Sequence, residues 1–289
     1  MLDFCLVAIF KNESEILKEW IEHYIREGCS KFFLIDNDSD DNYLPIIEKY
    51  CNSGKVELIK DPQKHAQKDL YNKYFLSKIK EYEWTLICDL DEFVYSRNDF
   101  NTIKDFLSSV KPDISQIAIP WKIFGSNGFD KLDKKEPKSV IDTFTKRMDY
   151  SKKEGFQGVS YIKEDVKMNL CKCIVRSEKV ISMDLHYSIK NDDMTIDDMT
   201  IDSRYQVLKC LPHIPCNEEI LEASNLQLNH YAIRSLDWFT RVKMTRGSAT
   251  SVKAGNIKGK IDYFYSFDKV SNDIDDIELR DKKSRMIII

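Results

Sequence analysis

The sequence contains no run of hydrophobic residues long enough to cross a membrane. A membrane-spanning helix needs about 20 consecutive apolar residues, whereas the apolar run near the start covers only residues 4–10. That run also lacks the basic segment and the cleavage site of a signal peptide. These absences predict a cytoplasmic protein with no transmembrane segment.

Two glycine-rich phosphate-binding motifs are also absent. No Gly-x-Gly-x-x-Gly follows the first apolar run, which disfavours a dinucleotide-binding Rossmann motif, and the lack of Gly-x-x-x-x-Gly-Lys-Ser/Thr excludes a P-loop. The 44 basic and 48 acidic residues give a net charge of −4, so nothing indicates a surface that binds nucleic acid. A nucleotide would have to be held by carboxylates, polar side chains and a metal ion.

Paired Cys-x-x-Cys motifs, which are typical of structural zinc sites, are missing as well. The chain has eight cysteines, but Cys5 and Cys88 fall in apolar, strand-like runs. We therefore expect reduced thiols rather than a disulfide framework. Cys171-Lys172-Cys173 lies in another strand-like run, and we interpret it as core packing.

The most informative segment that is present covers residues 84–93, where an apolar run ends in the acidic cluster Asp89, Asp91 and Glu92. The run is typical of a strand buried on both faces, and open α/β sheets bind ligands at the carboxyl ends of their strands. In a strand Asp89 and Asp91 would point to the same side, and a divalent cation would remove their repulsion. We predict a metal site that holds the diphosphate of a sugar nucleotide. The alternative is a solvated acidic loop.

Strand-like and helical patterns alternate along the first third of the chain. Asn12, with Glu15 three residues later, forms a capping-box pattern for the first helix. The alternation predicts a parallel sheet with helices on its faces. We expect strands at 2–10, 31–35, 56–59, 84 onward, 116–120, 169–176 and 226–231, and helices at 12–28, 44–51, 64–80, 102–110 and 235–247.

Polar side chains also follow other predicted elements. Asp36 and Asn37 end the second strand, where a carboxylate can bind the ribose or base of a nucleotide. The acidic loop that they begin lacks the central glycine and final glutamate of an EF-hand, so we do not expect calcium binding. Lys68, in the first turn of a helix, suits phosphate or base contacts, and a solvated helix face is the alternative.

Two later segments are predicted to be loops. Residues 121–128 combine aromatic side chains with glycine, which suits either a sugar-binding wall or a hydrophobic plug. Residues 192–196 are repeated as residues 197–201, and this repeat is too short for a solenoid unit. We expect the repeat to form an expanded surface loop.

Six segments of the chain form a combination of short motifs. They are Lys-Asn-Glu at 11–13, Glu-Trp-Ile-Glu-His-Tyr at 19–24, Asp-Asn-Asp-Ser at 36–39, Asp-Leu-Asp-Glu-Phe at 89–93, the Trp-x-x-Phe-Gly-Ser-x-Gly pattern at 121–128, and Asn-His-Tyr at 229–231 with the basic residues that follow it. Taken together, these segments resemble the GT-A glycosyltransferases, most closely the family 92-like (DUF23-related) branch of the family 2 type. The resemblance covers roughly residues 3–247 and implies an α/β fold of the GT-A (Rossmann-like) kind, with a mostly parallel central sheet flanked by helices. We expect a glycosyltransferase domain over residues 1–235 and a helical extension over 236–289.

The resemblance implies metal-dependent, inverting transfer of a sugar from a nucleotide sugar, in first place a UDP-sugar, to a hydroxyl of a glycan or glycoconjugate. Manganese is the usual cation and magnesium the alternative. Asp89 and Asp91 would bind the metal, Asp89 would also reach the ribose, and His230 or its competitor His186 would be the third ligand. The remaining implied contacts are with base and ribose, from Asn12, Glu13 and Asp36 with Asn37 beside it, and with the diphosphate, from Lys243 and Arg246.

The general base is not identified by the sequence, and Asp130 and Asp237 are the candidates. Two other functions stay open. A haloacid-dehalogenase-type phosphatase also uses Asp-x-Asp, but it carries Thr or Val where Phe93 stands in this sequence. A non-catalytic module that binds a nucleotide or sugar could use the same fold.

Overall fold

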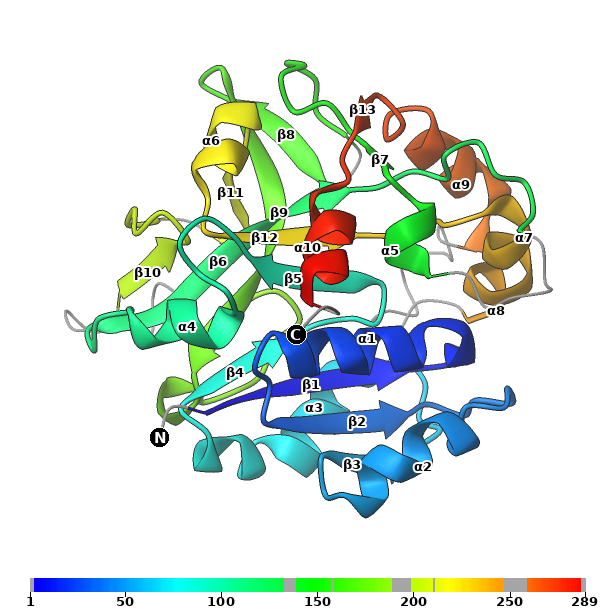
Figure 1. Ribbon diagram of the computed structural model, residues 1–289, viewed down its shortest axis with the longest axis vertical. Coiled ribbons are helices and arrows are strands. Elements are labelled where there is room, and N and C mark those ends of the chain that lie inside the picture. Colours follow the sequence, from blue (N-terminus) through cyan, green and yellow to red (C-terminus); the bar gives the residue numbers. More distant parts are fainter. Residues whose placement is uncertain are drawn as a thin grey trace.

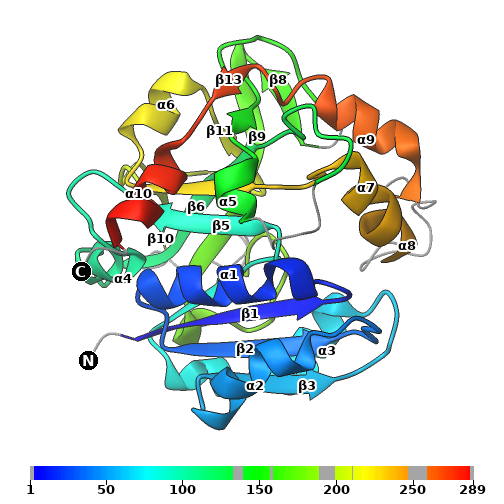
Figure 2. The ribbon, with the colours of Figure 1, turned by 45° about the vertical axis from the view of Figure 1, so that its right-hand side comes forward.

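The computed structural model describes residues 3–132, 139–156, 159–188, 199–209, 211–246 and 259–286. Within these residues an eleven-stranded sheet runs through the molecule, and helices cover it (Figures 1 and 2). This arrangement confirms the predicted α/β class with a central sheet flanked by helices. No helix in these ranges is long and apolar enough to span a membrane.

The first half of the sheet is parallel, in the order β3-β2-β1-β4, because a helical connection returns the chain to the same edge after each strand. Side chains alternate between the two faces of β1. Leu6 packs in the cluster that contains helices α1 and α2, whereas Val7 packs against α3 on the other face. The elements are β1 (Phe4–Phe10), α1 (Ser14–Arg26), β2 (Lys31–Asp36), α2 (Leu44–Asn52), β3 (Val56–Lys60), α3 (Gln67–Phe75), a 3₁₀ turn (Lys78–Glu81) and β4 (Trp84–Ile87).

The second half of the sheet is mixed. Strand β9 runs antiparallel between β4 and β6, β12 is parallel to β6, and β5 is antiparallel to β12. The elements are β5 (Glu92–Ser96), α4 (Ile103–Ser108), β6 (Ile114–Ile123), α5 (Val140–Thr143), β7 (Lys146–Arg147), β8 (Ser160–Lys163), β9 (Val166–Arg176), a 3₁₀ turn (Ser177–Lys179), β10 (Met199–Asp202), β11 (His213–Pro215), α6 (Glu218–Ala223) and β12 (Leu226–His230).

Three of the predicted local structures are wrong. Strand β6 continues to Ile123, so Trp121 belongs to a strand and not to a loop. Part of the second copy of the five-residue repeat forms the buried strand β10, while the first copy lies outside the described residues. Asn12 does not cap α1: the cap position is Glu13, and the φ angle of Asn12 is 55°.

The C-terminal segment packs into the same core as the N-terminal strands. Phe264, Phe267 and Leu279 belong to the apolar cluster that also contains Leu6 of β1. The division into a domain over 1–235 and an extension over 236–289 stays a prediction. The segment contains α7 (Leu236–Trp238), a π-helical turn (Phe239–Lys243), α8 (Met244–Arg246), α9 (Ile261–Asp268), β13 (Ile274–Asp275), which pairs with β7, and α10 (Glu278–Met286).

Helix α10 lies beside α1 and α5 (Figures 1 and 2). Its Lys282 ammonium is 2.5 Å from the carboxylate of Glu27 at the end of α1. The neighbouring Lys283 contacts Glu19 of α1 at 3.0 Å and Asp142 of α5 at 2.7 Å. These ion pairs hold the end of the chain against its first helix.

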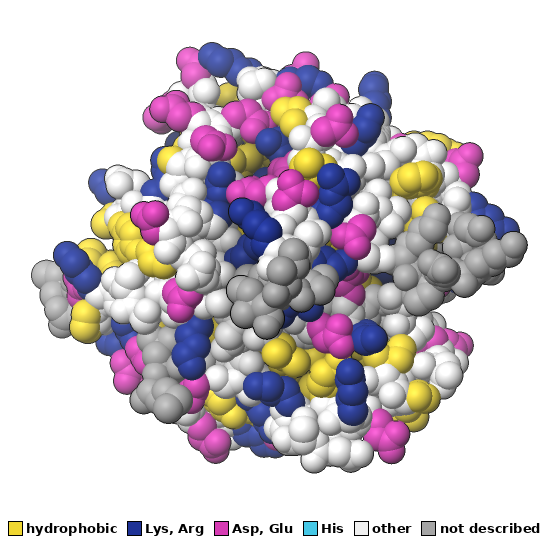
Figure 3. Space-filling model, viewed as in Figure 1, with side chains coloured by type: hydrophobic (Ala, Val, Ile, Leu, Met, Phe, Trp, Pro, Cys, Tyr) yellow, Lys and Arg dark blue, Asp and Glu magenta, His cyan; other side chains and the backbone are white. Residues whose placement is uncertain are grey.

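Acidic and basic side chains are interspersed over the face shown in Figure 3, and neither sign dominates it. This distribution agrees with a net charge close to zero for a chain of this size. The seven cysteines in the described ranges are free, and all except Cys51 are buried.

Candidate active site

Asp89 and Asp91 lie in the turn between β4 and β5, residues 88–91, and not in a strand, whereas Glu92 begins β5. We refer to residues 88–92 as the acidic turn. The two-residue period of a strand, on which the expectation of a common side for Asp89 and Asp91 is based, therefore does not apply here. Strand β4 pairs with β1, whereas β5 pairs with β12 at the far end of the sheet order. The turn thus joins the two halves of the sheet.

Three side chains of α1 bind the backbone around this turn. Trp20 Nε1–H donates to the carbonyls of Asp89 and Glu92, both at 3.1 Å. The Tyr24 hydroxyl donates to the Glu92 carbonyl and accepts from the Val94 N–H. His23 Nε2 is 2.7 Å from the Val94 carbonyl. Backbone groups buried without a partner would be costly, so this helix fixes the course of the turn.

Asp89 is held from two sides. Gln67 Nε2 of α3 donates to Oδ1 at 3.2 Å, and the Lys172 ammonium of β9 lies 3.1 Å from Oδ2. Lys172 also contacts Glu92 at 3.4 Å, and Glu92 accepts from the Asp89 N–H at 2.9 Å. Burial raises the pKa of Glu92 to about 8. The Asp89 side chain is 39% exposed, so it remains accessible to a ligand.

Asp91 is more buried, with its side chain 9% exposed. Its Oδ2 is 2.6 Å from the Lys243 ammonium and its Oδ1 is 3.6 Å from His230 Nε2. Burial alone would raise the pKa of Asp91, but Lys243 and His230 hold it well below the usual value. Lys243 ends the π-helical turn, an irregularity that is common at functional sites.

His230 and Asp91 have the donor types that suit a divalent cation. A cation shared by the two side chains would bind Asp91 Oδ1 and His230 Nε2, the atoms that face each other at 3.6 Å. The other imidazole nitrogen, Nδ1, is buried without a hydrogen-bond partner among the described residues. No group of three or more His, Cys, Asp or Glu residues suited to a metal occurs in the described ranges, so a cation at this site stays a prediction. His186 instead faces the Cys171 carbonyl through Nδ1 at 2.9 Å.

Trp121 lies beside both histidines. Its ring centroid is 4.3 Å from that of His230 and 5.4 Å from that of His186. Its side chain is largely buried, since the residue is 8% exposed. The aromatic segment predicted as a sugar-binding wall is thus adjacent to the acidic turn, and its role as a wall stays a prediction.

A second cluster combines two guanidinium groups with one carboxylate. Glu13 is 3.1 Å from Arg234 and 2.5 Å from Arg246. The Arg234 guanidinium also stacks on Trp238, 3.9 Å from the ring centroid. Two cations share a single buried carboxylate, so the cluster carries excess positive charge that suits an anion.

The remaining predicted residues bind partners in their own or neighbouring segments. Asp36 accepts from the Ser39 N–H and the Tyr43 hydroxyl, Asn37 donates to the carbonyls of Asp61 and Gln63, and Asn12 Oδ1 accepts from the Asp40 N–H. Lys68 pairs with Asp184 at 2.8 Å. Their nucleotide-binding roles stay predictions.

The two candidate bases are neighbours in the structure. The Asp237 N–H donates to the Asp130 carbonyl at 2.8 Å, and the Asp237 carboxylate pairs with Arg241 at 2.8 Å. Asp130 is exposed. Either carboxylate therefore remains a candidate.

Sequence reasoning missed Lys172 and Trp20 as parts of this site. A lysine inside an apolar, strand-like run such as residues 169–176 is a usable signal, because a buried ammonium needs a carboxylate partner. Trp20 stands in the segment 19–24 that carries part of the resemblance, but its spacing on α1 is that of an ordinary core residue and does not indicate a contact with the acidic turn.

Acid pH is expected to destabilise the fold through His23. Burial lowers the pKa of His23 to about 3 from 6.5, so the unfolded chain binds the proton more readily. Stability is then complete above pH 6.5 and is lost as the pH falls towards 3, by about 2 kcal/mol at pH 5. Urea unfolding of the wild type and of His23→Gln between pH 7 and 5 measures this loss. Equal pH slopes for the two proteins would contradict it.

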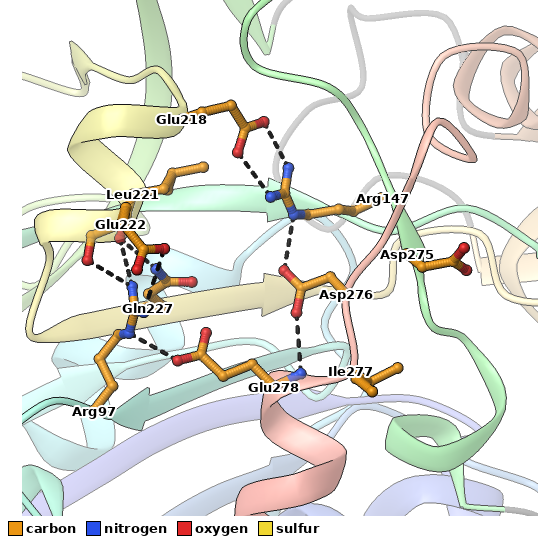
Figure 4. A pocket seen from close by; sticks show the side chains of 10 residues that line it. All are labelled: Arg97, Arg147, Glu218, Leu221, Glu222, Gln227, Asp275, Asp276, Ile277 and Glu278. Carbon is orange, nitrogen blue, oxygen red and sulfur yellow. Dashed lines mark hydrogen bonds and ion pairs between the residues drawn. The ribbon is translucent and has the colours of Figure 1, made fainter.

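A cavity of about 320 Å³ lies away from the acidic turn (Figure 4). Gln227 lines it at the opposite end of β12 from His230. Arg147 sits between Glu218 and Asp276, with contacts of 2.8 Å to each. Most of the charged side chains that line the cavity pair with one another, whereas Asp275 points away from them. The cavity therefore lies where the C-terminal segment meets β7 and α6.

Comparison with known proteins gives a family match over residues 1–258, to the model described as glycosyltransferase family 92. A glycosyltransferase family 92 protein of Oryza sativa subsp. japonica is 29% identical over 134 residues, which are 45% of this chain and 23% of the rice protein. One of Ricinus communis is 24% identical over 131 residues, 44% of this chain and 23% of that protein. The matched segment therefore spans about a quarter of these relatives.

Among solved structures, S. aureus TarS 1–349 in complex with UDP is 16% identical, with a TM-score of 0.36, over 66% of this chain and 53% of that chain. The apo form of the glycosyltransferase GlyE from Streptococcus pneumoniae TIGR4 is 15% identical, with a TM-score of 0.27, over 41% of this chain and 29% of that chain. TM-scores below 0.5 say nothing further about this chain.

Proposed function

Because the chain belongs to glycosyltransferase family 92, we propose that it transfers a sugar from a nucleotide-sugar donor to a hydroxyl of a glycan or glycoconjugate. The first candidate for the donor is a UDP-sugar. The proposed cation is Mn²⁺ or Mg²⁺, and the proposed transfer inverts the configuration at the anomeric carbon. The observation that carries the proposal is the meeting of Asp91 with His230 and Lys243 beside the exposed carboxylate of Asp89.

Asp91 and His230 would hold the cation, with Asp89 contributing from the same turn. A bound cation supplies Lewis-acid stabilisation of the leaving diphosphate. Lys243 and Arg246 are the proposed contacts for the diphosphate oxygens, since both carry donors for anionic ligands, Lys243 contacts Asp91, and Arg246 follows it three residues later.

In the transfer step the acceptor hydroxyl oxygen attacks the anomeric carbon as the bond to the diphosphate breaks. The diphosphate leaves with the bonding electron pair, and a carboxylate takes the hydroxyl proton. Asp130 and Asp237 are the proposed bases. Loss of transfer in Asp130→Asn or in Asp237→Asn, with donor binding retained, would identify the base, and retained transfer in both would remove both from consideration.

Thermal unfolding with UDP, GDP and CMP, each with MnCl₂ or with EDTA, tests the proposed donor class. A ligand at 100 times its Kd stabilises the native state by about 2.7 kcal/mol, which raises the Tm of a chain of this size by about 4–5 °C. We expect this rise with UDP and manganese and its loss with EDTA. An unchanged Tm with every nucleotide would contradict the proposal, and binding without release of UDP from UDP-sugars would favour the non-catalytic module.

A further inference from the structure

Lys172 occupies an unusual place for a charged residue. It lies in β9 opposite Ile119 of β6, two residues before the segment of β9 that pairs with β4, and its side chain is 1% exposed. Its ammonium contacts two carboxylates of the acidic turn, Asp89 at 3.1 Å and Glu92 at 3.4 Å. Moving an ammonium out of water is costly unless it is paired, so this position is filled by a lysine only because both carboxylates face it.

The two carboxylates differ in exposure, and this difference suggests what the lysine does. Glu92 is fully buried and binds the Asp89 N–H, so it completes the packing of the turn. Asp89 is 39% exposed, yet both of its oxygens are contacted by buried side chains, Gln67 on one and Lys172 on the other. A carboxylate that is accessible to solvent while buried side chains fix its orientation is preorganised to bind a ligand.

We propose that Lys172 is a positioning residue that orients the Asp89 carboxylate towards the nucleotide sugar. The proposal rests on the proposed function, because it needs Asp89 to contact the donor or its cation. Lys172 itself is too buried to touch the ligand and acts through Asp89. Removing such a supporting contact typically lowers the affinity or activity of a site ten- to a hundredfold.

Lys122 provides a matched control. It is also a lysine with 1% of its side chain exposed, it lies on the neighbouring strand β6, and it pairs with Asp276 at 2.8 Å. It contacts neither carboxylate of the acidic turn among the contacts described for it. Lys122→Met therefore removes a buried ammonium of the same kind without touching Asp89.

The experiment measures the Kd for UDP with MnCl₂ by calorimetry, on folded protein of each variant. We expect Lys172→Met to weaken binding ten- to a hundredfold and Lys122→Met to bind within about twofold of the wild type. Lys172→Met/Glu92→Gln removes the ammonium and also the buried carboxyl group that it contacts, and it guards against loss of folding. It should regain stability yet bind as weakly as Lys172→Met, because Asp89 still lacks its contact.

A fourth comparison separates positioning from a general loss of structure. In an Asp89→Asn background, Lys172→Met should cause no further loss of affinity, because residues that act as a unit are not additive. Equal binding by Lys172→Met and Lys122→Met, or restored binding in the charge-balanced double variant, would overturn the inference. If the wild type binds no nucleotide, the proposed function fails and this inference fails with it.

Discussion

With a UDP-sugar as the donor, Asp91→Asn is expected to lower the rate of UDP release about a thousandfold. The substitution removes the carboxylate that faces both His230 and Lys243. A metal ion contributes several kcal/mol to stabilising a leaving diphosphate, and each 1.36 kcal/mol is a factor of ten in rate. The fold should persist, since the Asp91 carbonyl still accepts from the Tyr231 N–H.

Asp165→Asn is the matched control for this measurement. Asp165 is exposed in the turn between β8 and β9, and its φ of 64° is a conformation that asparagine also adopts. The Asp165→Asn variant should release UDP at the same rate as the wild type. Residual activity in Asp91→Asn above a tenth of wild type would show that Asp91 is not the principal ligand of a catalytic cation.

Glu27→Ala is expected to destabilise the protein by about 3–5 kcal/mol, the typical cost of breaking a buried ion pair. The Glu27 carboxylate is 1% exposed and binds Lys282 together with the N–H groups of Ser96 and Ile103. Its removal leaves a largely buried ammonium and two buried donors without their partner. Urea unfolding measures the difference in free energy.

Glu222→Ala serves as the control for that loss. Glu222 is also an acid in an ion pair, 3.6 Å from Arg97, but its side chain is 85% exposed. An exposed pair contributes about 0–1 kcal/mol, so this variant should unfold close to the wild type. A loss below about 1 kcal/mol in Glu27→Ala would mean that α10 is not anchored through Glu27.

The parallel half of the fold could be predicted because its strands are apolar runs separated by helical spacing. The same rule failed where a strand-like run stops early. Residues 84–95 have the composition of one strand, but the chain turns after Ile87 and re-enters the sheet beside β12. Local propensity carries no information on that long-range pairing. A prediction from propensity therefore treats residues 84–95 as one strand, in which Asp89 and Asp91 would lie on the same side.

Most charged residues of the candidate site could be named from the sequence, but Lys172 could not. Asp89, Asp91 and His230 stand in short motifs, whereas Lys172 lies 83 residues from Asp89 in sequence and meets it only through the pairing of β9 with β4. Repulsion between carboxylates indicated a metal ion. In the described residues lysines 172 and 243 already neutralise these carboxylates, so the repulsion alone does not require a cation.

The course of the turn also limits how the two halves of the sheet can move. Strands β4 and β5 are separated by three others in the sheet order, about 19 Å in a flat sheet, yet the chain from Ile87 to Glu92 can extend only about 17 Å. The sheet must therefore curl, and α1 lies inside the curl between β1 and β5 (Figures 1 and 2). A hinge between the halves would break the hydrogen bonds that α1 makes to the turn and to β5, so we expect the two halves of the sheet to move as one body.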